Sequence, residues 1–381
     1  DLYLTIDSGL QRNLDYLMSN AYSESGAEVV TAGVMEIKTG KILAMSTYPS
    51  FNPNERNIST FNNYFLEGTI ECGSVFKPFI YADSIEEGKY DHNAYYNSGS
   101  YNVYYGNKLV ATIKDHNGGQ GWGTITYDQG LYHSSNVAIC NLLDQGYVTK
   151  DVLTEKLNDL GFFQGDTMDG LTCSSSINAY TRKNAGRLEY LTTGFGQGST
   201  VTPYQLLKAY SVFGNDGKTV QPHIVDKVVN PETNKVVYQA TPKYSKQIFS
   251  TNTISQVKDL MLGVIEDEQG TGKTYRLDND VRMIGKTGTG QVVENGGYST
   301  TLYMHSFVGI APYDDPQVVM FLTFKSGDSY AQYMPNIVKQ TMNEALQVVN
   351  RYNAKNTTAV DQSCTLDSYT NQSVNYVKSK L

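Results

Sequence analysis

The chain has few cysteines, and none of them stands in the C-x-x-C spacing of many metal-binding and redox pairs. Its 381 residues include only four, and no C-x-x-C spacing occurs among them. Four cysteines are too few to hold a chain of this length together by disulfides. The chain is instead long enough to bury a large hydrophobic core, as one big domain or as two ordinary ones.

Long apolar runs and clusters of basic residues are also absent. No stretch approaches the roughly 18 to 20 apolar residues that a membrane-spanning helix needs. The 30 Lys and Arg against 38 Asp and Glu give a net charge of -8, so we expect no nucleic-acid partner. Thirty tyrosines against one tryptophan indicate a polar surface that faces solvent. The opening DLYLTIDSGLQ is not a signal peptide. We expect it to lie inside a longer protein whose membrane anchor is missing from this chain.

The first 50 residues contain a helix and a β-hairpin. Ser8 and Gln11 have the spacing of a capping box, and apolar residues then recur at helical intervals, so the helix is predicted to begin near residue 8. Residues 29 to 47 read as two strands around a Lys38-Thr39-Gly40 turn, whose glycine can take a left-handed conformation.

Strand character returns between residues 281 and 325, where three consecutive antiparallel strands are predicted, followed by an amphipathic helix. The middle of the chain reads as mainly helical. Strands at both ends must pair to be buried, which predicts an α+β fold with a five-stranded antiparallel sheet covered by helices and a mainly helical lobe. The predicted sheet lobe comprises about 1–73 and 255–350, and the predicted helical lobe about 74–254. The polar, aperiodic residues 351–365 are predicted to be a linker.

Ser74 and Lys77 stand three residues apart in ECGSVFKPF. At the start of a helix, Lys77 would project on the same side as Ser74, with its amine in reach of the serine oxygen. A serine becomes a good nucleophile when a neighbouring base takes its proton, and helix N-terminal amides favour developing negative charge. Ser255 and Lys258 share the spacing, but they lie in a periodic stretch that indicates an ordinary helix surface.

Two further motifs contain polar side chains at short spacing. Ser134 and Asn136 stand two apart on a tight connection between helical stretches, where they can relay a proton and bind a peptide group. Lys286 opens K-T-G-T inside a strand-like stretch, with Lys286 and Gly288 on one face of the strand and Thr287 on the other. A glycine within a strand allows a ligand to lie against the backbone.

In chain order, S-x-x-K at a helix start, S-x-N between helices and K-T-G-T on a strand form the set typical of penicillin-binding proteins and serine β-lactamases. The chain resembles the transpeptidase domain of a class B penicillin-binding protein. The resemblance covers residues 1 to about 350 and includes DLYLTIDSGLQ, GKILAMSTYPSFNPN, LTTGFGQGSTVTPYQLLKAYSVFGNDGK and YMHSFVGIAP. Residues 366–381 resemble the opening half of a PASTA-like module, and a free helical tail is the alternative.

The resemblance implies an active site between the sheet lobe and the helical lobe, and a reaction on the D-Ala-D-Ala end of a peptidoglycan stem peptide. It makes Ser74 the nucleophile, Lys77 its base, Ser134 a proton relay and Asn136 a ligand of the substrate amide. It also makes Lys286 a catalytic residue.

On the K-T-G-T strand, the resemblance places Lys286, Thr287 and Thr289 at the substrate carboxylate and makes Gly288 part of the binding strand. The amides of Ser74 and Thr289 would hold the oxyanion. No cofactor is required, and β-lactams should acylate Ser74. The expected partners are stem peptides and a membrane glycosyltransferase, at the outer face of a bacterial cell membrane. A D,D-carboxypeptidase, a β-lactamase of the same fold and a non-catalytic β-lactam sensor are the alternatives.

Cys72 departs from the family, which commonly has proline at this position. If the first two motifs converge, Cys72 and Cys140 lie near the active site. Between them Asp115 is followed by His116, where the family often has Asp followed by Trp. Two thiolates, an imidazole and a carboxylate form a reasonable tetrahedral zinc set, so Cys72, Asp115, His116 and Cys140 are a candidate structural zinc site.

Other interpretations of these residues remain. His133 is an alternative zinc ligand, while inert reduced thiols and a Cys72–Cys140 disulfide are alternatives to zinc. Cys173 and Cys364 look unrelated to the site. A stretch that resembles a phosphate-binding loop, residues 270 to 274, lacks its first glycine, whose place is taken by Asp267, so we reject nucleotide binding.

Overall fold

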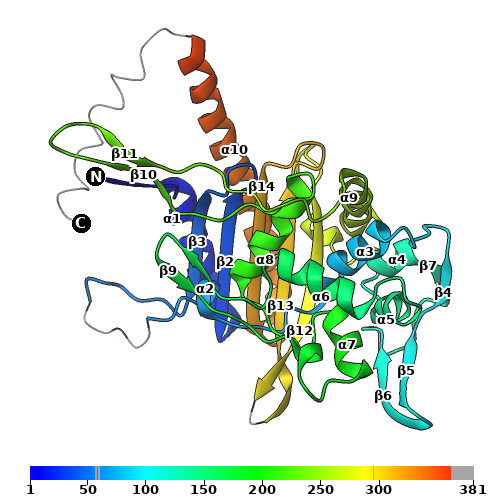
Figure 1. Cartoon of the computed structure of the whole chain (residues 1–381). Helices are drawn as coiled ribbons and strands as arrows, with labels where there is room; N and C mark the ends of the chain where they lie inside the picture. Colours follow the sequence, from blue (N-terminus) through cyan, green and yellow to red (C-terminus); the bar gives the residue numbers. More distant parts are fainter. Residues whose placement is uncertain (56–57, 59–60, 295, 362–381) are drawn as a thin grey trace.

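The computed structural model describes residues 1–55, 58, 61–294 and 296–361. Its centre is a five-stranded antiparallel sheet with the strand order β12-β13-β14-β2-β3 (Figure 1). The strands are β2 (Val29–Glu36), β3 (Ile42–Tyr48), β12 (Ile284–Glu294), β13 (Gly297–Ala311) and β14 (Val318–Ser326). The predicted α+β fold class is confirmed, and β12 forms one edge of this sheet.

The two ends of the chain meet in the middle of the sheet. Strand β2 pairs with β14 in a register that sets Val30 opposite Phe324 and Val34 opposite Met320. Seven of the eight residues of β2 are buried, because both faces of the sheet are covered. The predicted hairpin turn is also present, and Gly40 adopts a φ of 80°. The pairing of the N-terminal hairpin with the C-terminal strands therefore follows the prediction.

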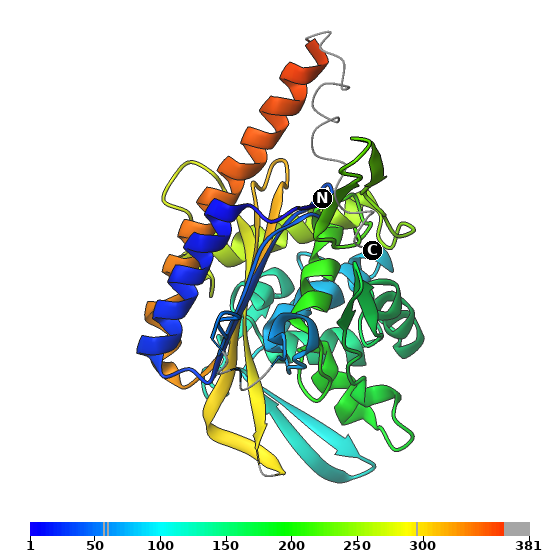
Figure 2. The same cartoon turned by 90° about the vertical axis from the view of Figure 1, so that its left-hand side faces the viewer.

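Helices α1 (Ser8–Ser25) and α10 (Met334–Asp361) lie side by side on one face of the sheet (Figure 2). Helix α1 begins at the predicted residue, but its N-cap is Asp7 rather than Ser8. The Asp7 carboxylate accepts hydrogen bonds from the amides of Gly9 and Leu10, both at 3.0 Å. A carboxylate at the N-cap satisfies two amides that have no partner within the helix.

Helix α10 is longer than the sequence pattern indicated. The apolar residues predicted to cover the sheet are buried: Ile337, Val338, Met342, Ala345, Val348 and Val349. Beyond them the helix continues to Asp361 and projects past the body of the protein (Figure 2). Most of the stretch predicted as a linker is therefore helical. Residues 362–381, with Cys364 and the predicted tail, lie outside the described residues.

The second lobe packs against the opposite face of the sheet (Figure 1), with α8 and α9 in contact with its strands. Its helices, with α2 from the sheet lobe, are α2 (Tyr64–Glu67), α3 (Lys77–Glu86), α4 (Tyr127–Tyr132), α5 (Asn136–Asp144), α6 (Lys150–Asp159), α7 (Arg187–Gly194), α8 (Pro203–Tyr210) and α9 (Thr251–Glu266). Short 3-10 turns add η1 (Gly73–Phe76), η2 (Ala179–Thr181), η3 (Ser211–Gly214), η4 (Lys273–Tyr275) and η5 (Asp328–Gln332).

Small strand pairs supplement this mainly helical lobe, and the sequence pattern did not indicate them. They are β4 (Tyr95–Asn97) with β7 (Thr124–Thr126), β5 (Ser100–Tyr105) with β6 (Lys108–Lys114), and β8 (Asp166–Met168) with β9 (Leu171–Cys173). A separate sheet joins β1 (Leu2–Leu4), β10 (Val225–Val229) and β11 (Val236–Gln239). Hairpin β5–β6 projects on the same side as the β12–β13 hairpin (Figure 2).

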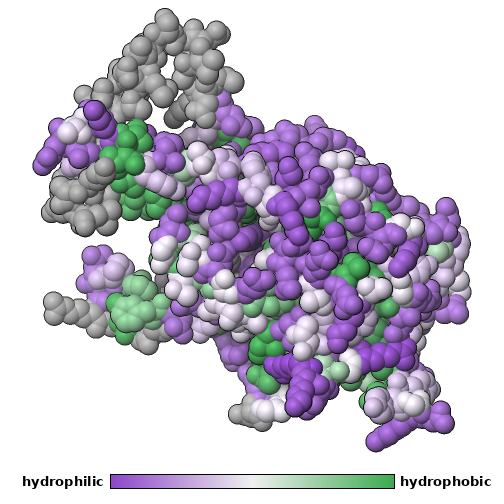
Figure 3. Space-filling view, viewed as in Figure 1, coloured by the Kyte–Doolittle hydropathy of each residue, from purple (hydrophilic) through white to green (hydrophobic). Residues whose placement is uncertain are grey.

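The surface seen in Figure 3 is mostly hydrophilic, with scattered apolar residues, as the composition indicated. Within the described part of the chain, no helix combines the length and the apolar character needed to cross a bilayer.

Candidate active site

Ser74 lies at the junction of the sheet and the helical lobe. It is the second residue of η1, which leads directly into α3 at Lys77. Its side chain is partly exposed, whereas Lys77 is completely buried. The S-x-x-K motif therefore stands at a helix start as predicted, although the serine itself belongs to a 3-10 turn.

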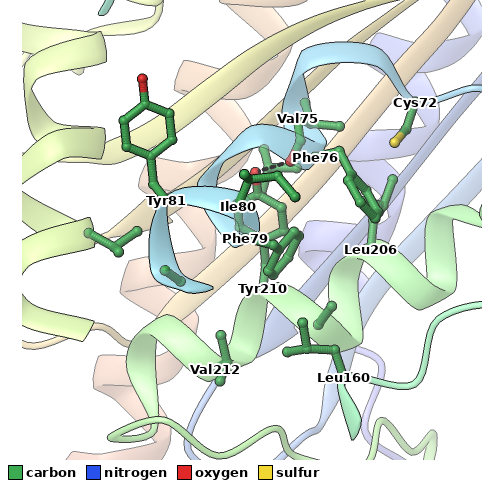
Figure 4. Close-up of a cluster of buried hydrophobic side chains, with 14 of the residues drawn as sticks. Cys72, Val75, Phe76, Phe79, Ile80, Tyr81, Leu160, Leu206, Tyr210 and Val212 are labelled. Carbon is green, nitrogen blue, oxygen red and sulfur yellow. Dashed lines mark hydrogen bonds between the residues drawn. The ribbon is translucent and has the colours of Figure 1, made fainter. Parts of the chain in front are cut away.

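The segment after Ser74 is anchored in the core (Figure 4). The Tyr210 hydroxyl donates to the Val75 carbonyl at 2.5 Å. The Phe79 ring packs edge-on against the Tyr210 ring, with centroids 5.1 Å apart. Buried aromatic contacts of this kind make a local backbone rigid, so the segment that follows Ser74 is held in place by α8.

Ser134 and Asn136 lie on the connection between α4 and α5. Ser135 caps α5, its hydroxyl accepting a hydrogen bond from the Ala138 amide at 3.0 Å. Asn136 is the first residue of α5. Ser134 adopts a φ of 58°, in the left-handed region that non-glycine residues seldom occupy.

A buried aspartate holds this connection in place. One carboxylate oxygen of Asp115 accepts from the Ser135 hydroxyl at 2.8 Å and from the amides of Asn136 and Val137 at 2.7 and 3.1 Å. The other oxygen accepts from the Gly99 amide at 2.8 Å. Because these donors include the first amides of α5, Asp115 fixes the S-x-N motif on the end of its helix.

The Lys77 amine points at the S-x-N motif. It lies 2.5 Å from the Ser134 carbonyl oxygen, 2.8 Å from the Asn136 side-chain oxygen and 3.4 Å from the Ser134 hydroxyl. Burial lowers the pKa of Lys77 to about 7, against a smaller opposing effect of the Asp115 carboxylate. Near neutral pH this amine is therefore a base as well as a hydrogen-bond donor.

The third motif reaches the same serine from the sheet. The Lys286 amine donates to the Ser134 hydroxyl at 2.8 Å and to the Thr287 carbonyl at 3.0 Å. Burial, and then repulsion by Lys77, lower the pKa of Lys286 well below its ordinary value. The Ser134 hydroxyl thus lies between two buried amines that belong to different lobes.

Strand β12 approaches the Ser74 segment backbone to backbone. A Cβ on Gly288 would lie 2.7 Å from the Cys72 carbonyl oxygen, and one on Gly290 only 1.8 Å from that of Glu71. Gly73, with a φ of 62°, faces the strand in the same way, since a Cβ at this position would fall 2.3 Å from the Thr289 carbonyl oxygen. Glycine is required where two backbones come this close.

The side chains of β12 alternate between the two faces of the strand as predicted. Lys286 and Gly288 are buried toward the helical lobe, while Thr287 and Thr289 are more exposed. The Thr287 hydroxyl donates to the Thr271 hydroxyl at 2.9 Å.

A cleft of about 730 Å³ joins the three motifs. Ser74, Ser134, Asn136, Thr287, Gly288 and Thr289 all line it. Lys77 and Lys286 lie directly behind Ser134 through the contacts given above. The catalytic and substrate-binding residues predicted from the sequence are therefore brought together around one opening.

The cleft also has walls that the sequence motifs did not identify. They include Ala111, Thr112 and Lys114 of β6, Phe195 and Gln197 after α7, Thr271 and Thr274 before β12, Gln291 and Tyr303 of the β12–β13 hairpin, and His116. The Thr271 loop belongs to the stretch rejected as a phosphate loop. Its only signal in the sequence was its position shortly before K-T-G-T.

The predicted zinc site is wrong. The described residues contain no group of three or more His, Cys, Asp and Glu side chains that could hold a metal ion. Both oxygens of Asp115 accept from protein donors, and the His116 Nε2 atom lies 2.9 Å from the His133 carbonyl oxygen, to which it donates. His133 stacks on Trp122 instead of joining a metal set.

The cysteines are buried free thiols. Cys72, Cys140 and Cys173 form no disulfide among the described residues. Burial raises the pKa of both Cys72 and Cys140, so both side chains remain protonated thiols when no metal is bound. Reduced thiols are therefore the interpretation that the structure favours. Ser255, which shares the S-x-x-K spacing, is an exposed residue on α9, as expected for an ordinary helix surface.

Comparison with known proteins decides the family. Residues 30–347 match the penicillin-binding protein transpeptidase domain. The chain belongs to this family.

Relatives of this transpeptidase domain include the Stage V sporulation protein D of Bacillus subtilis, 31% identical over 339 residues, which cover 87% of this chain and 51% of the relative. A peptidoglycan D,D-transpeptidase FtsI homolog of Mesostigma viride is 27% identical over 84% of this chain and 56% of the relative. The chain thus spans about half the length of these relatives.

Solved structures share the fold of this transpeptidase domain. Penicillin-binding protein 2X from Streptococcus thermophilus superposes with a TM-score of 0.81 at 25% identity, covering 91% of this chain and 52% of the other. The transpeptidase domain of Burkholderia pseudomallei penicillin-binding protein 3 gives a TM-score of 0.76 at 23% identity over 91% and 96% of the two chains, and it supports the fold alone.

Proposed function

We propose that this chain is a peptidoglycan D,D-transpeptidase that cross-links stem peptides through an acyl-serine intermediate. One observation carries the proposal. Two buried amines from different lobes, those of Lys77 and Lys286, converge on the Ser134 hydroxyl at the floor of the cleft that Ser74 lines. The family and the names of the relatives support the same reaction.

Acylation begins with Ser74. Its oxygen attacks the penultimate D-Ala carbonyl, and Lys77 takes the hydroxyl proton. A neutral lysine has two N–H groups and one lone pair. The Ser134 carbonyl and the Asn136 side-chain oxygen accept from the two N–H groups. The third contact, to the Ser134 hydroxyl, is longer at 3.4 Å, so the lone pair can take the Ser74 proton and then pass it toward Ser134. A placed base of this kind contributes about 10²- to 10⁴-fold in rate.

The proton then moves to the leaving group. Ser134 passes it to the nitrogen of the terminal D-Ala as the C–N bond breaks, which leaves an ester between Ser74 and the remaining peptide. Lys286, bonded to the Ser134 hydroxyl, supports this relay. The amides of Ser74 and Thr289 stabilise the oxyanion, each worth about 10²- to 10³-fold.

Binding residues surround this centre. Asn136 holds the substrate amide, and Thr287, Thr289 and Lys286 receive the terminal carboxylate, with Gly288 keeping the strand close. The described cleft-lining residues include Lys114 but no Asp or Glu. A cleft without carboxylates suits an anionic peptide end. It also has no acidic side chain to activate water, which argues against a β-lactamase.

In the second half of the reaction, the amine of a neighbouring stem peptide attacks the acyl ester and forms an amide. The amine loses a proton to the Ser134 and Lys77 relay, which returns it to the Ser74 oxygen as the ester bond breaks. No metal or other cofactor takes part.

We also propose that the enzyme works at the outer face of a bacterial cell membrane, anchored by a segment that this chain does not include, beside a membrane glycosyltransferase. We propose residues 1–73 and 255–350 as the sheet lobe and residues 74–254 as the helical lobe. Helix α9, which contacts both β12 and α3, spans this boundary.

Turnover of a stem-peptide analogue ending in D-Ala-D-Ala tests the reaction class. We expect release of D-Ala and, when an amine acceptor is added, a cross-linked product that Ser74→Ala does not form. Hydrolysis that ignores the acceptor would instead indicate a carboxypeptidase. Acylation without turnover would indicate a sensor, and rapid hydrolysis of penicillin a β-lactamase.

A further inference from the structure

The backbone of Ser134 needs an external support. Its φ of 58° costs conformational free energy for any residue other than glycine, and strain of this kind persists only where the surroundings hold it. The hydroxyl of Ser134 must nevertheless stay in line with two amines. Lys77 holds the Ser134 carbonyl on one side. The residue before Ser134 is held by different groups.

His116 holds the preceding peptide unit. Its Nε2 atom lies 2.9 Å from the carbonyl oxygen of His133. Because a carbonyl can only accept, the proton of the imidazole must sit on Nε2. This hydrogen bond fixes the carbonyl of residue 133, and therefore the plane of the peptide that leads into Ser134. His116 also lines the catalytic cleft.

Trp122 holds the side chain of His133, the residue before Ser134. Its indole stacks on the His133 imidazole, with ring centroids 4.6 Å apart and planes within 9°. It also touches the His116 ring, with centroids 5.4 Å apart. The single tryptophan of the chain thus lies between the two histidines.

The loop that carries Trp122 is shaped for this position. Asn117 closes the loop through two hydrogen bonds with the backbone of Gly121, at 2.9 and 3.0 Å. The glycines around Trp122, at 118, 119, 121 and 123, all have positive φ, a conformation that only glycine adopts at little cost. The Trp122 amide is fixed by the Ser98 hydroxyl at 2.6 Å.

We infer that Asp115, His116 and Trp122 form a clamp that sets the position of Ser134 for proton transfer, and that His116 is a positioning residue of the reaction. Asp115 fixes the residues after Ser134, while His116 and Trp122 fix the residue before it. The inference rests on the proposed function. In this arrangement, residues 115 to 122 join the motif-bearing segments through hydrogen bonds and ring stacking, without a metal.

The test compares two substitutions of His116 in penicillin acylation. His116→Phe keeps a ring beside Trp122 but removes the donor, so we expect the acylation rate constant to fall about 3- to 10-fold, the range for one lost hydrogen bond. The dissociation constant of the non-covalent complex should change less than about twofold. His116→Gln retains an N–H at a comparable reach and should recover most of the rate. His92→Phe is the matched control, because His92 bonds Asp128 and Gln256, outside the cleft.

A double-mutant cycle with Ser134→Ala separates positioning from a general loss of structure. If His116 acts through the Ser134 hydroxyl, His116→Phe should matter less once that hydroxyl is gone. The factor by which it lowers the acylation rate constant of Ser134→Ala should be less than half of the factor by which it lowers that of the wild type. An undiminished loss, or a wild-type rate in His116→Phe, overturns the inference. A wild-type protein that is not acylated at all would overturn the proposed function as well, so the two failures are distinguishable.

Discussion

At the scale of single residues, the proposed mechanism depends on the protonation state of Lys77. Its amine is removed from water, and burial lowers its pKa to about 7. Only the neutral amine can take the Ser74 proton, so acylation should become faster as the pH rises through this value. We expect penicillin acylation to be about tenfold slower near pH 6 than near pH 8, because the neutral fraction changes by that factor. Rapid-mixing acylation across this range measures it. A flat profile would show that Lys77 is not the base, and a midpoint near the ordinary pKa of lysine would show that burial does not lower the pKa of this amine.

Residue identity alone did not reveal which donors each side-chain oxygen accepts from. The motif residues around Ser74 were predictable, because S-x-x-K, S-x-N and K-T-G-T each place reactive groups within a few residues of one another. Asp115 was misassigned as a zinc ligand, because a carboxylate that ligates a metal and one that caps a helix look alike in a sequence. Its role depends on the amides of Asn136 and Val137, which only the folded connection brings to it.

At the scale of elements, the approach of β12 to the Ser74 segment depends on glycine. In Gly290→Ala the new methyl would fall 1.8 Å from the Glu71 carbonyl oxygen, so the strand must move. A displacement of about 1 Å costs roughly 10²-fold in rate at a catalytic site, and we expect a loss of that order in penicillin acylation. Gly297→Ala, in the same hairpin with no atom near its new methyl, is the control. Equal rates in the two variants would show that this contact does not position the nucleophile.

The α4–α5 connection should depend on Asp115 for its stability. Asp115→Ala leaves the buried donors of Gly99, Ser135, Asn136 and Val137 without their acceptor. A buried unsatisfied donor costs about 1–3 kcal/mol. We therefore expect the free energy of unfolding, measured by urea denaturation, to fall by about 3–5 kcal/mol, since water satisfies part of the loss.

Asp91→Ala is the matched comparison for this effect. Asp91 also accepts from a backbone amide, that of Asn93 at 2.8 Å, but in an exposed turn. Its removal should cost about 0.5 kcal/mol or less. The account of Asp115 would be wrong if both variants unfolded at the same urea concentration.

Element boundaries were predictable where apolar residues repeat and not where they stop. The buried positions of α1 and of the first half of α10 follow the helical interval, but the last turns of α10 contain no such repeat and were read as a linker. The β5–β6 hairpin was missed for a related reason. Its exposed face is rich in polar and tyrosine residues, so it lacks the alternation that indicates a strand.

At the scale of the whole molecule, the two lobes should hold together without a metal. Cys72 and Cys140 are buried with raised pKa values, and the Asp115 carboxylate is saturated with protein donors. We expect a chelator to leave the melting temperature unchanged and elemental analysis to find no stoichiometric zinc. Stoichiometric zinc, together with a lower melting temperature after chelation, would restore the metal site that the geometry rejects.

The overall architecture was predictable because strands at both ends of a chain must pair to bury their apolar faces. The meeting of three distant motifs in one cleft came from the family resemblance, because no local pattern states that residues 74, 134 and 286 are neighbours. The cleft walls, such as Gln197 and Thr271, come from loops without periodicity and needed the structure.

The most direct test of the central claim is the mass of the intact protein after brief exposure to penicillin, followed by peptide mapping. The account predicts a single covalent adduct on the peptide that contains Ser74, present in wild type and in Ser255→Ala, which has the same S-x-x-K spacing on an exposed helix, and absent from Ser74→Ala. An unmodified wild-type protein, or an adduct that persists in Ser74→Ala, would contradict it.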